Sequence, residues 1–323
     1  AVHATHYAER ADVQAFIADM QSRHGMDSAG LAALFEKVRP IPAVLKAIKP
    51  PADPGIRSWT AYRQRFIEPR RIAAGLAFWR QHQATLARAE ARFGVPAAII
   101  VSIIGVETFY GKQLGRFGSF AALATLAFDY PPRAELFRRE LEALLLLAQD
   151  EGRAPDSYKG SFAGAIGLPQ FLPSSIRAYA IDFDGNGRID LTASPIDAIG
   201  SAANFLKEHG WETGGPIAVR VKVGAGGTAS QALIEEGIKP ARHPAEIAGF
   251  GVEVPATAPD APAALIDLVT PAAPTEYWLG YQNFYVITRY NRSSFYAMTV
   301  FQFAKTLQEQ RVGYAERSRM EMW

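Results

Sequence analysis

The 323-residue chain contains no cysteine. This absence excludes disulfide frameworks, thiolate zinc sites, iron–sulfur clusters and cysteine nucleophiles. A strong charge of one sign is also missing, because 34 lysines and arginines oppose 32 aspartates and glutamates and leave a net charge of +2. The sequence therefore predicts no nucleic-acid partner, although the small basic excess is compatible with an anionic polymer as substrate.

Long apolar segments and several common cofactor motifs are absent too. The longest apolar run, residues 95–106, is interrupted by Ser102 and is shorter than the roughly 20 residues that span a bilayer. The start of the chain lacks the basic and apolar regions of a signal peptide, so any targeting segment is expected to have been removed or never present. The six histidines never pair at a zinc-helix spacing, and no phosphate-binding loop, dinucleotide fingerprint or G-x-S-x-G elbow occurs. No organic cofactor is expected.

The residues that remain predict a helical protein. With 49% hydrophobic residues, the chain can form a packed core, and its length suggests about two folding units. Apolar side chains recur at intervals of three and four residues through the first two hundred positions, which is typical of amphipathic helices. The expected helices include residues 13–20, 31–38, 97–107, 134–148 and 196–209.

The pattern changes near residue 214. Apolar and polar residues alternate over 217–223, as in a half-buried strand, and further short strands are expected at 252–254, 265–269 and 284–288. The fold class predicted from these patterns is mainly α with a small inserted β module, that is, α+β.

Glu107 is the first candidate for chemistry. It closes a predicted helix in which the twelve preceding residues carry no charge, so its carboxyl should be partly desolvated and near the negative end of the helix dipole. Both effects favour the protonated form that a general acid needs. The alternative is a glutamate that simply reaches solvent at a helix end.

A second candidate site lies in the segment Asp182 to Asp190. Oxygen-bearing side chains at its positions 1, 3 and 5 and a glycine at position 6 match the first part of an EF-hand calcium loop. Position 12, where a glutamate normally completes the shell, is Ala193, and the next acid is Asp197. Calcium is the favoured interpretation and a plain Asp/Gly turn the alternative. The predicted metal-site residues are Asp182, Asp184, Asn186, Arg188 and Asp197.

Several motifs together resemble the membrane-bound lytic murein transglycosylase B family, whose catalytic core is lysozyme-like. The resemblance spans roughly residues 100–300 in the family's order. It rests on Gly105-Val106-Glu107-Thr108, on Ala163 to Gly167 with Gln170-Phe171 and Pro173-Ser174-Ser175, on the calcium-like loop, and on Arg289-Tyr290-Asn291.

The resemblance implies cleavage of the bond between N-acetylmuramic acid and N-acetylglucosamine in peptidoglycan. Glu107, which matches the family's catalytic glutamate, would act first as acid and then as base, so that the C6 hydroxyl of the muramyl ring forms a 1,6-anhydro product without water. One carboxylate is then sufficient, unlike in ordinary glycosidases. The alternatives are a lysozyme-type hydrolase in which a second carboxylate such as Asp129 positions water, and a glycan-binding protein without catalysis.

The same match implies a set of substrate-binding residues and two departures from the family. Phe205 stands where the family often has a cleft tyrosine, and the metal loop is one residue longer between Leu191 and Asp197. The substrate-binding residues implied are Tyr62, Arg133, Ser161, Gln170, Phe171, Phe205, Tyr290, Asn291 and Tyr296.

The resemblance also implies a domain organisation and a compartment. Residues 1–95, completed by a C-terminal helix over 289–323, would form a helical domain, residues 96–213 the lysozyme-like core with its structural calcium loop, and residues 214–288 the β module. The expected partners are peptidoglycan glycan strands and cell-wall synthesis or remodelling complexes. The expected compartment is the periplasm. Membrane attachment is expected only through a lipid anchor in the outer membrane, and such an anchor is expected to be absent from this chain because it has no cysteine.

Overall fold

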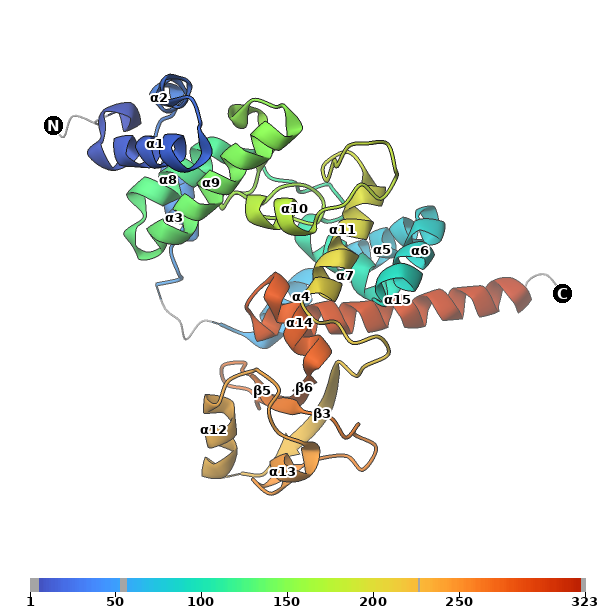
Figure 1. Cartoon of the computed structure of the whole chain (residues 1–323). Helices are drawn as coiled ribbons and strands as arrows, with labels where there is room; N and C mark the ends of the chain where they lie inside the picture. The colour runs from blue at the N-terminus through green and yellow to red at the C-terminus, as the bar shows by residue number, and fades with distance from the viewer. Residues whose placement is uncertain (1–5, 53–56, 226, 321–323) are drawn as a thin grey trace. The chain divides into compact units, whose positions relative to one another are not determined.

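The computed structural model describes residues 6–52, 57–225 and 227–320 (Figure 1). Over these residues helices dominate and strands are short and antiparallel, so the predicted class, mainly α with a small β module, is confirmed. The chain forms two compact units from separated stretches of sequence. Unit 1 comprises Ala1–Pro51, Gln113–Ala180 and Asp190–Ser194, and unit 2 comprises Ala52–Lys112, Ile181–Ile189 and Pro195–Trp323.

Unit 1 is a helical assembly around the antiparallel pair α8 and α9. Nine of the eleven residues of α8 are buried, and α9 buries Phe137, Leu141, Leu144 and Leu145 on one face at helical spacing. A two-stranded ribbon pairs β1 with β2. The elements are η1 (Tyr7–Glu9), α1 (Ala11–His24), α2 (Ser28–Lys37), α3 (Pro42–Ile48), β1 (Phe117–Gly118), α8 (Ser119–Asp129), η3 (Pro131–Arg133), α9 (Ala134–Glu151), η4 (Pro155–Ser157), β2 (Lys159–Gly160) and α10 (Pro173–Tyr179).

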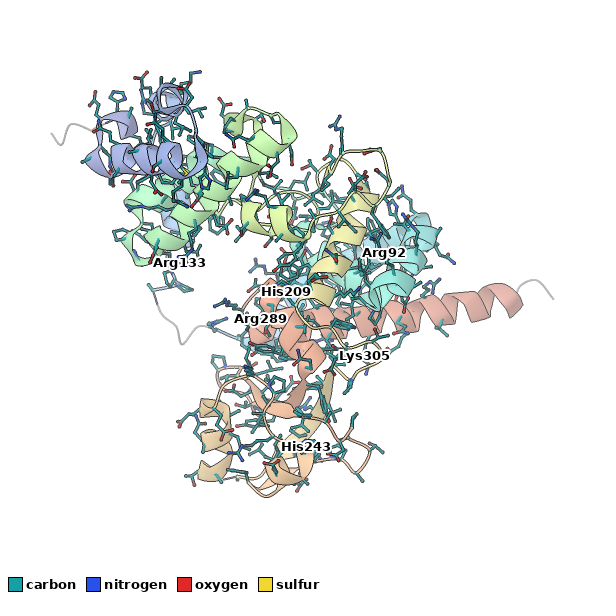
Figure 2. All side chains as sticks on the ribbon, viewed as in Figure 1. Arg92, Arg133, His209, His243, Arg289 and Lys305 are labelled. Atoms are coloured by element: carbon teal, nitrogen blue, oxygen red, sulfur yellow. The ribbon has the colours of Figure 1, made fainter. Side chains whose placement is uncertain are left out.

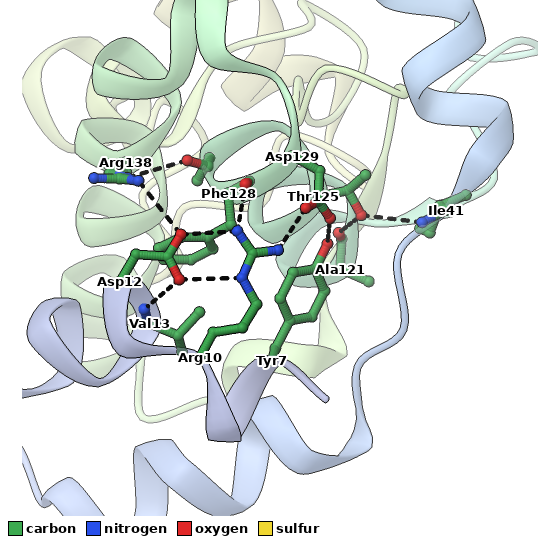
Figure 3. A network of polar contacts seen from close by, with 11 residues as sticks. Tyr7, Arg10, Asp12, Val13, Ile41, Ala121, Thr125, Phe128, Asp129 and Arg138 are labelled. Atoms are coloured by element: carbon green, nitrogen blue, oxygen red, sulfur yellow. Dashed lines mark hydrogen bonds and ion pairs between the residues drawn. The ribbon is translucent and has the colours of Figure 1, made fainter. Parts of the chain in front are cut away.

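A polar network attaches the N-terminal segment of unit 1 to the end of α8 (Figure 3). The Arg10 guanidinium lies between the carboxylates of Asp12 and Asp129 and also donates to the Phe128 carbonyl at 2.7 Å. The Tyr7 hydroxyl donates to Asp129. Because the guanidinium and both carboxylates are partly buried and mutually paired, the network fixes the entry of α1 against α8.

Unit 2 is centred on the apolar helix α7, which packs against α5, α6, α11 and the long C-terminal α15. Every residue of α7 is buried except Glu107, and the Ser102 hydroxyl donates to the Val300 carbonyl of α15 at 2.7 Å. Such a helix must be central, because no face of it is polar. The helices are α4 (Trp59–Phe66), α5 (Pro69–Gln81), α6 (Gln83–Phe93), α7 (Ala97–Thr108), α11 (Pro195–Glu208), α12 (Thr228–Glu235), α13 (Pro244–Ala248), α14 (Gln282–Tyr290) and α15 (Ser294–Met320).

The β module of unit 2 is a four-stranded antiparallel sheet in the order β4-β3-β6-β5. Val219 and Leu265 both lie opposite Leu279 of the central β6, and α12 packs on β5. The strands are β3 (Ala218–Val223), β4 (Val252–Glu253), β5 (Ala263–Leu268) and β6 (Glu276–Tyr281).

The predicted strand at 284–288 is wrong, because these residues belong to α14. Their β-branched and aromatic side chains suggested a strand, yet the buried residues include the pairs Asn283-Phe284 and Ile287-Thr288, four positions apart as on a helix face, with Val286 buried beside them. The strand lies just before them, at β6, which the periodicity did not indicate.

Across the described residues, no single helix combines the length and apolarity that crossing a bilayer requires. Helices α6 and α7 meet the criterion only as a pair, and they are bent by 114° at their junction.

Candidate active site

Glu107 lies in the last turn of α7 and is half-buried, whereas every other residue of that helix is buried. Desolvation raises the pKa of its carboxyl from the ordinary 4.5 to about 7, although the hydrogen bond from Tyr296 acts in the opposite direction. No other charged group among the described residues contributes to this shift. A carboxyl with this pKa can both give and take a proton near neutral pH.

Three tyrosines surround this carboxyl. The Tyr296 hydroxyl, at the start of α15, donates to Glu107 Oε1 at 2.7 Å. Burial, and then the negative charge of Glu107, raise the pKa values of Tyr296 and Tyr290 well above 10 and that of Tyr62 to about 12. All three phenols therefore stay protonated at neutral pH and are available as hydrogen-bond donors.

Aromatic rings extend from the tyrosines in two directions. Tyr290 lies parallel to Tyr296, with ring centroids 6.4 Å apart, and meets Phe205 of α11 edge-on at 4.8 Å. Phe205 is buried, and its ring stacks on that of His209 with centroids 3.9 Å apart. The structure thus places Phe205 beside Tyr290, but its side chain presents no hydroxyl to a ligand.

On the other side, Tyr62 of α4 packs against the Phe295 ring, with centroids 5.6 Å apart. Asn291, the last of the predicted substrate residues in unit 2, is the exposed C-cap of α14. Unit 2 therefore brings together Tyr62, Glu107, Phe205, Tyr290 and Tyr296, and it holds Asn291 at the end of the same helix as Tyr290.

The chain turns sharply after Glu107. Phe109 and Tyr110 both adopt left-handed backbone conformations, with φ of 49° and 59°. The Tyr110 ring enters the space over Gly105 and Gly75, where an added Cβ would lie 2.4 and 2.5 Å from its hydroxyl oxygen. Only glycine permits this approach at both helices. The conformation costs on the order of 1–2 kcal/mol per residue, which the packing of the ring must offset.

Arg71 of α5 holds the same helix end, and the sequence did not reveal it. Its Nε donates to the Gly105 carbonyl at 3.1 Å and its Nη1 to the Arg65 carbonyl at 2.9 Å. The guanidinium carbon lies 4.6 Å from the centre of the Phe109 ring and 5.2 Å from that of Phe66. Burial lowers the pKa of Arg71, yet a cation at a helix C-terminus is favourable. A basic residue in an amphipathic helix ordinarily faces solvent, so no local pattern distinguishes this one.

The remaining predicted substrate residues belong to unit 1 and are described within it. The Ser161 hydroxyl accepts backbone N–H groups of Ala163 and Ala165, at 3.3 and 3.0 Å, and so orders its own loop. Gln170 has a φ of 52°, and its Nε2 donates to the Gly167 carbonyl at 2.9 Å.

Phe171 of the same loop is buried and forms an antiparallel bridge with Ile166. Arg133 is exposed at the end of η3 (Figure 2). Its guanidinium carbon lies 5.1 Å from the centre of the Phe137 ring. Unit 1 thus places Ser161, Gln170 and Phe171 in one tight loop and Arg133 on a different element.

Asp129, the candidate for a second carboxylate, is engaged elsewhere in unit 1. Both of its oxygens are used, one by the Tyr7 hydroxyl and one by Arg10 (Figure 3). Its side chain therefore orders the N-terminal segment.

The predicted metal loop brings three carboxylates together. Ligand atoms of Asp182, Asp184 and Asp197 all lie within 4.8 Å of one another. Calcium binds oxygens at about 2.3–2.6 Å, so this separation suits a shared ion. Asn186 and Arg188 stay in the turn, where the Asn186 Oδ1 accepts the Arg188 N–H at 2.9 Å.

The loop is anchored at Phe183. The Arg88 guanidinium lies 3.7 Å from the centre of its ring, and Arg88 also donates to its carbonyl at 2.7 Å. The buried Asp197 carboxylate accepts the N–H of Phe183 at 2.9 Å, which joins the loop to α11. The third carboxylate of the cluster thus comes from Asp197 on α11, whereas in an EF-hand the last acidic residue belongs to the loop itself.

Comparisons with known proteins identify the family of the chain and several of its relatives. The transglycosylase SLT domain model matches residues 8–305. The chain is 40% identical over 315 residues to the membrane-bound lytic murein transglycosylase B of Escherichia coli K12, covering 95% of this chain and 85% of that one.

Two solved structures are similar along most of their length. E. coli lytic transglycosylase Slt35 in complex with calcium is 40% identical, with a TM-score of 0.83 and 95% of each chain covered. SltB3 of Pseudomonas aeruginosa in complex with NAG-NAM-pentapeptide is 32% identical, with a TM-score of 0.77, covering 92% of this chain and 79% of that one.

The matched domain model and the 40% identical murein transglycosylase define the class as an enzyme that cleaves glycosidic bonds. The chain belongs to the transglycosylase SLT domain family. It is a lytic transglycosylase, which confirms the predicted enzyme class in preference to a hydrolase or a non-catalytic binding protein.

Proposed function

We propose that this lytic transglycosylase cleaves the β-1,4 bond between N-acetylmuramic acid and N-acetylglucosamine in peptidoglycan and leaves a 1,6-anhydromuramyl end. The proposal is supported by the relatives, one a murein transglycosylase and one bound to a NAG-NAM-pentapeptide. The single observation that carries the mechanism is the desolvated position of the Glu107 carboxyl at the end of α7, which raises its pKa to about 7 with no contribution from another charged group among the described residues.

Glu107 performs both proton transfers in this mechanism. Protonated, it gives its proton to the bridging oxygen as the bond to the muramyl C1 breaks. The resulting carboxylate then takes the proton of the C6 hydroxyl on the same ring, whose oxygen forms the new bond to C1. The proton is thereby returned, no water enters, and one carboxyl is sufficient because the nucleophile is already held in place. The family resemblance is the basis for this intramolecular step.

Tyr296 has a defined part in this cycle. Its hydroxyl donates to Glu107 Oε1, so it stabilises the carboxylate between the two transfers. The hydrogen bond also orients the carboxyl without supplying a competing acid, because the pKa of Tyr296 stays well above 10.

We further propose that the residues implied by the family resemblance bind the glycan. The aromatic faces suit stacking on sugar rings, and the polar groups suit their hydroxyls and amides. These residues are Tyr62, Arg133, Ser161, Gln170, Phe171, Phe205, Tyr290, Asn291 and Tyr296. Within this proposal residues 96–213 form the lysozyme-like core, residues 1–95 with 289–323 the helical domain, and residues 214–288 the β module.

We also propose that Asp182, Asp184 and Asp197 hold a structural calcium ion, with Asn186 and the backbone of Arg188 completing the shell. The 4.8 Å spacing of the carboxylates and the calcium complex of Slt35 support this proposal. The ion would stabilise the connection between the loop and α11, and it takes no part in the proton transfers.

The compartment we propose is the periplasm, where peptidoglycan is found. Support comes from the E. coli relative, which is a membrane-bound murein transglycosylase. An outer-membrane anchor on a longer precursor and association with cell-wall synthesis or remodelling complexes belong to the same proposal.

Product analysis tests the function. Purified peptidoglycan is digested with the wild type, with Glu107→Gln and with Glu208→Gln, an exposed glutamate of α11 that controls for loss of charge. The wild type and the control should release muropeptides one water lighter than hydrolysed ones and resistant to borohydride, and Glu107→Gln should release none. Reducing ends would show hydrolysis, and full activity of Glu107→Gln would assign the acid to another residue.

A further inference from the structure

One buried carboxylate of unit 1 takes no part in the proton transfers proposed above. Glu140 of α9 is only 7% exposed. No lysine, arginine or histidine in the described ranges forms an ion pair with it. A carboxylate that is removed from water without a counterion is unfavourable unless hydrogen-bond donors replace its hydration. The groups that donate to Glu140 therefore indicate its role.

Ser174 of α10 supplies two such donors. Its backbone N–H donates to Glu140 Oε2 at 3.0 Å, and its hydroxyl donates to Oε1. Ser174 is the second residue of α10, where a backbone N–H has no partner within its own helix. The N-cap residue that normally accepts this N–H is Leu172, whose side chain has no acceptor. Glu140 thus caps α10 from a different helix.

The capped helix begins directly after the loop that carries three of the proposed glycan-binding residues, Ser161, Gln170 and Phe171. Within the loop, the Ile166 N–H donates to the Phe171 carbonyl at 2.8 Å, and the Phe171 N–H donates to the Ile166 carbonyl at 3.1 Å. These bonds fix Phe171 on one side. The contact between Glu140 and α10, three residues later, fixes the chain on the other side.

Gln170 is the residue of this loop that depends most on such support. Its φ of 52° is unfavourable for a residue with a side chain and persists only where the surroundings enforce it. Its Nε2 donates to the Gly167 carbonyl at 2.9 Å and to the Leu114 carbonyl at 3.3 Å. The amide oxygen Oε1 is then the atom of Gln170 that can accept a hydrogen bond from a ligand. A displaced start of α10 would release the backbone that holds this amide in place.

We propose that Glu140 is a positioning residue for glycan binding, which holds the loop in its binding conformation through Ser174 and the start of α10. The inference rests on the proposed function, because it takes the glycan as the ligand of this loop. Loss of Glu140 should weaken the contacts of Gln170 with the glycan. The proton transfers should be unaffected, since Glu107 belongs to unit 2. Contacts that are lost equally in the ground state and the transition state raise KM and leave kcat unchanged.

Steady-state cleavage of a soluble oligosaccharide of alternating N-acetylglucosamine and N-acetylmuramic acid provides the test. Glu140→Ala should raise KM about tenfold, because a buried hydrogen bond to a charged group is lost, while kcat and its pH profile stay as in the wild type. Glu140→Gln should bind almost as well as the wild type, since its amide can accept the Ser174 N–H and donate to the Ser174 hydroxyl.

An exposed ion pair between the same two helices provides the matched control. Arg177 of α10 lies 3.0 Å from Asp150 of α9, and both side chains are exposed. Asp150→Ala therefore removes a contact between α9 and α10 without uncapping the start of α10, and it should leave KM unchanged. An equal rise of KM in Asp150→Ala and Glu140→Ala would assign the effect to general packing of α10 and would overturn the inference.

Binding of the same oligosaccharide to Glu107→Gln, measured by calorimetry, separates this inference from the proposed function. In that background Glu140→Ala should raise the Kd about tenfold. An unchanged Kd, or a fall in kcat of Glu140→Ala without a change in KM, would contradict the positioning role. Failure of the wild type to cleave the oligosaccharide would instead contradict the proposed function.

Ser174→Ala keeps the test decisive if Glu140→Ala does not fold. It removes only the hydroxyl and retains the backbone N–H that Glu140 accepts, so it should raise KM about threefold, as the loss of one hydrogen bond predicts. A KM equal to that of the wild type would show that the contact between Glu140 and Ser174 does not support glycan binding.

Discussion

Substitution of Glu107 by glutamine should stabilise unit 2 at high pH while it abolishes activity. The carboxyl has a pKa of about 7 in the folded chain against an ordinary 4.5, chiefly because burial disfavours its charge. A group that holds its proton more tightly when folded costs stability as the pH rises through this interval. The interval of about 2.5 pH units corresponds to about 3 kcal/mol at roughly 1.4 kcal/mol per unit.

Glutamine has nearly the same shape as the protonated acid and does not ionise. Tyr296 can still donate to its amide oxygen, so the hydrogen bond is retained. The difference in unfolding free energy between the variant and the wild type should therefore be small below about pH 4.5 and should grow to about 3 kcal/mol in favour of glutamine above about pH 7.

Tryptophan fluorescence during urea unfolding can measure this difference in unit 2 alone. Trp59, Trp79, Trp211 and Trp278 all belong to unit 2, and the sequence of unit 1 contains no tryptophan. Midpoints and slopes would be recorded for wild type, Glu107→Gln and the exposed control Glu208→Gln at acidic and at mildly basic pH. If the difference in unfolding free energy between Glu107→Gln and the wild type were the same at both pH values, or less favourable to the variant at the higher pH, the claim that Glu107 is desolvated would be refuted.

Three further predictions follow from the same geometry. Tyr296→Phe removes a hydrogen bond to the charged form of Glu107 and should therefore raise the pKa of that carboxyl. The basic limb of the kcat/KM profile should then move up by about one pH unit. A limb that stays in place or moves to lower pH would contradict the role of Tyr296. Arg71→Met leaves the Gly105 carbonyl of α7 and the Arg65 carbonyl of α4 without this donor, and it should destabilise unit 2 by about 3 kcal/mol and shift the pH profile of activity. Arg71→Lys should restore part of the stability and shift the pH profile less. Tryptophan fluorescence and the pH profile measure the two effects, and equal behaviour of the two variants would exclude a positioning role. Calcium at about a hundred times its Kd should raise the unfolding free energy by about 2.7 kcal/mol, and Asp184→Asn should reduce that gain. Scanning calorimetry with and without a chelator measures the change in stability. An unfolding temperature that does not change at millimolar calcium would eliminate the metal site.

The sequence predicted the parts of the site that depend on local order. Glu107 could be identified because an uncharged helix must be buried, and an acid at its end must then be desolvated. The metal loop could be identified because Asp182, Asp184 and Asn186 alternate along the chain and Gly187 follows at position 6, the spacing that an oxygen-lined calcium turn requires. The half-buried strand β3 was evident from its alternation, since successive side chains in a strand face opposite sides.

Residues whose partners come from distant segments could not be predicted in this way. Arg71 binds carbonyls of α4 and α7, and nothing in its own helix distinguishes it from a solvated arginine. Glu140 likewise accepts its hydrogen bonds from Ser174 of a different helix, 34 positions later in the chain. The strand predicted at 284–288 is wrong for the same reason: β-branched residues suit either structure, and the packing of α14 against its neighbours selects the helix.

The helical class, the buried helix α7, the acid at its end and the order of the metal-loop oxygens follow from the amino-acid sequence, because each of these depends on residues a few positions apart. Which side chains reach Glu107 depends instead on how distant segments pack together. Tyr296 is 189 positions away in the chain, yet its hydroxyl lies 2.7 Å from the carboxyl oxygen. Desolvation and hydrogen bonding act over a few ångströms of space, whatever the separation in sequence, and so the pKa on which catalysis depends is a property of the packed unit.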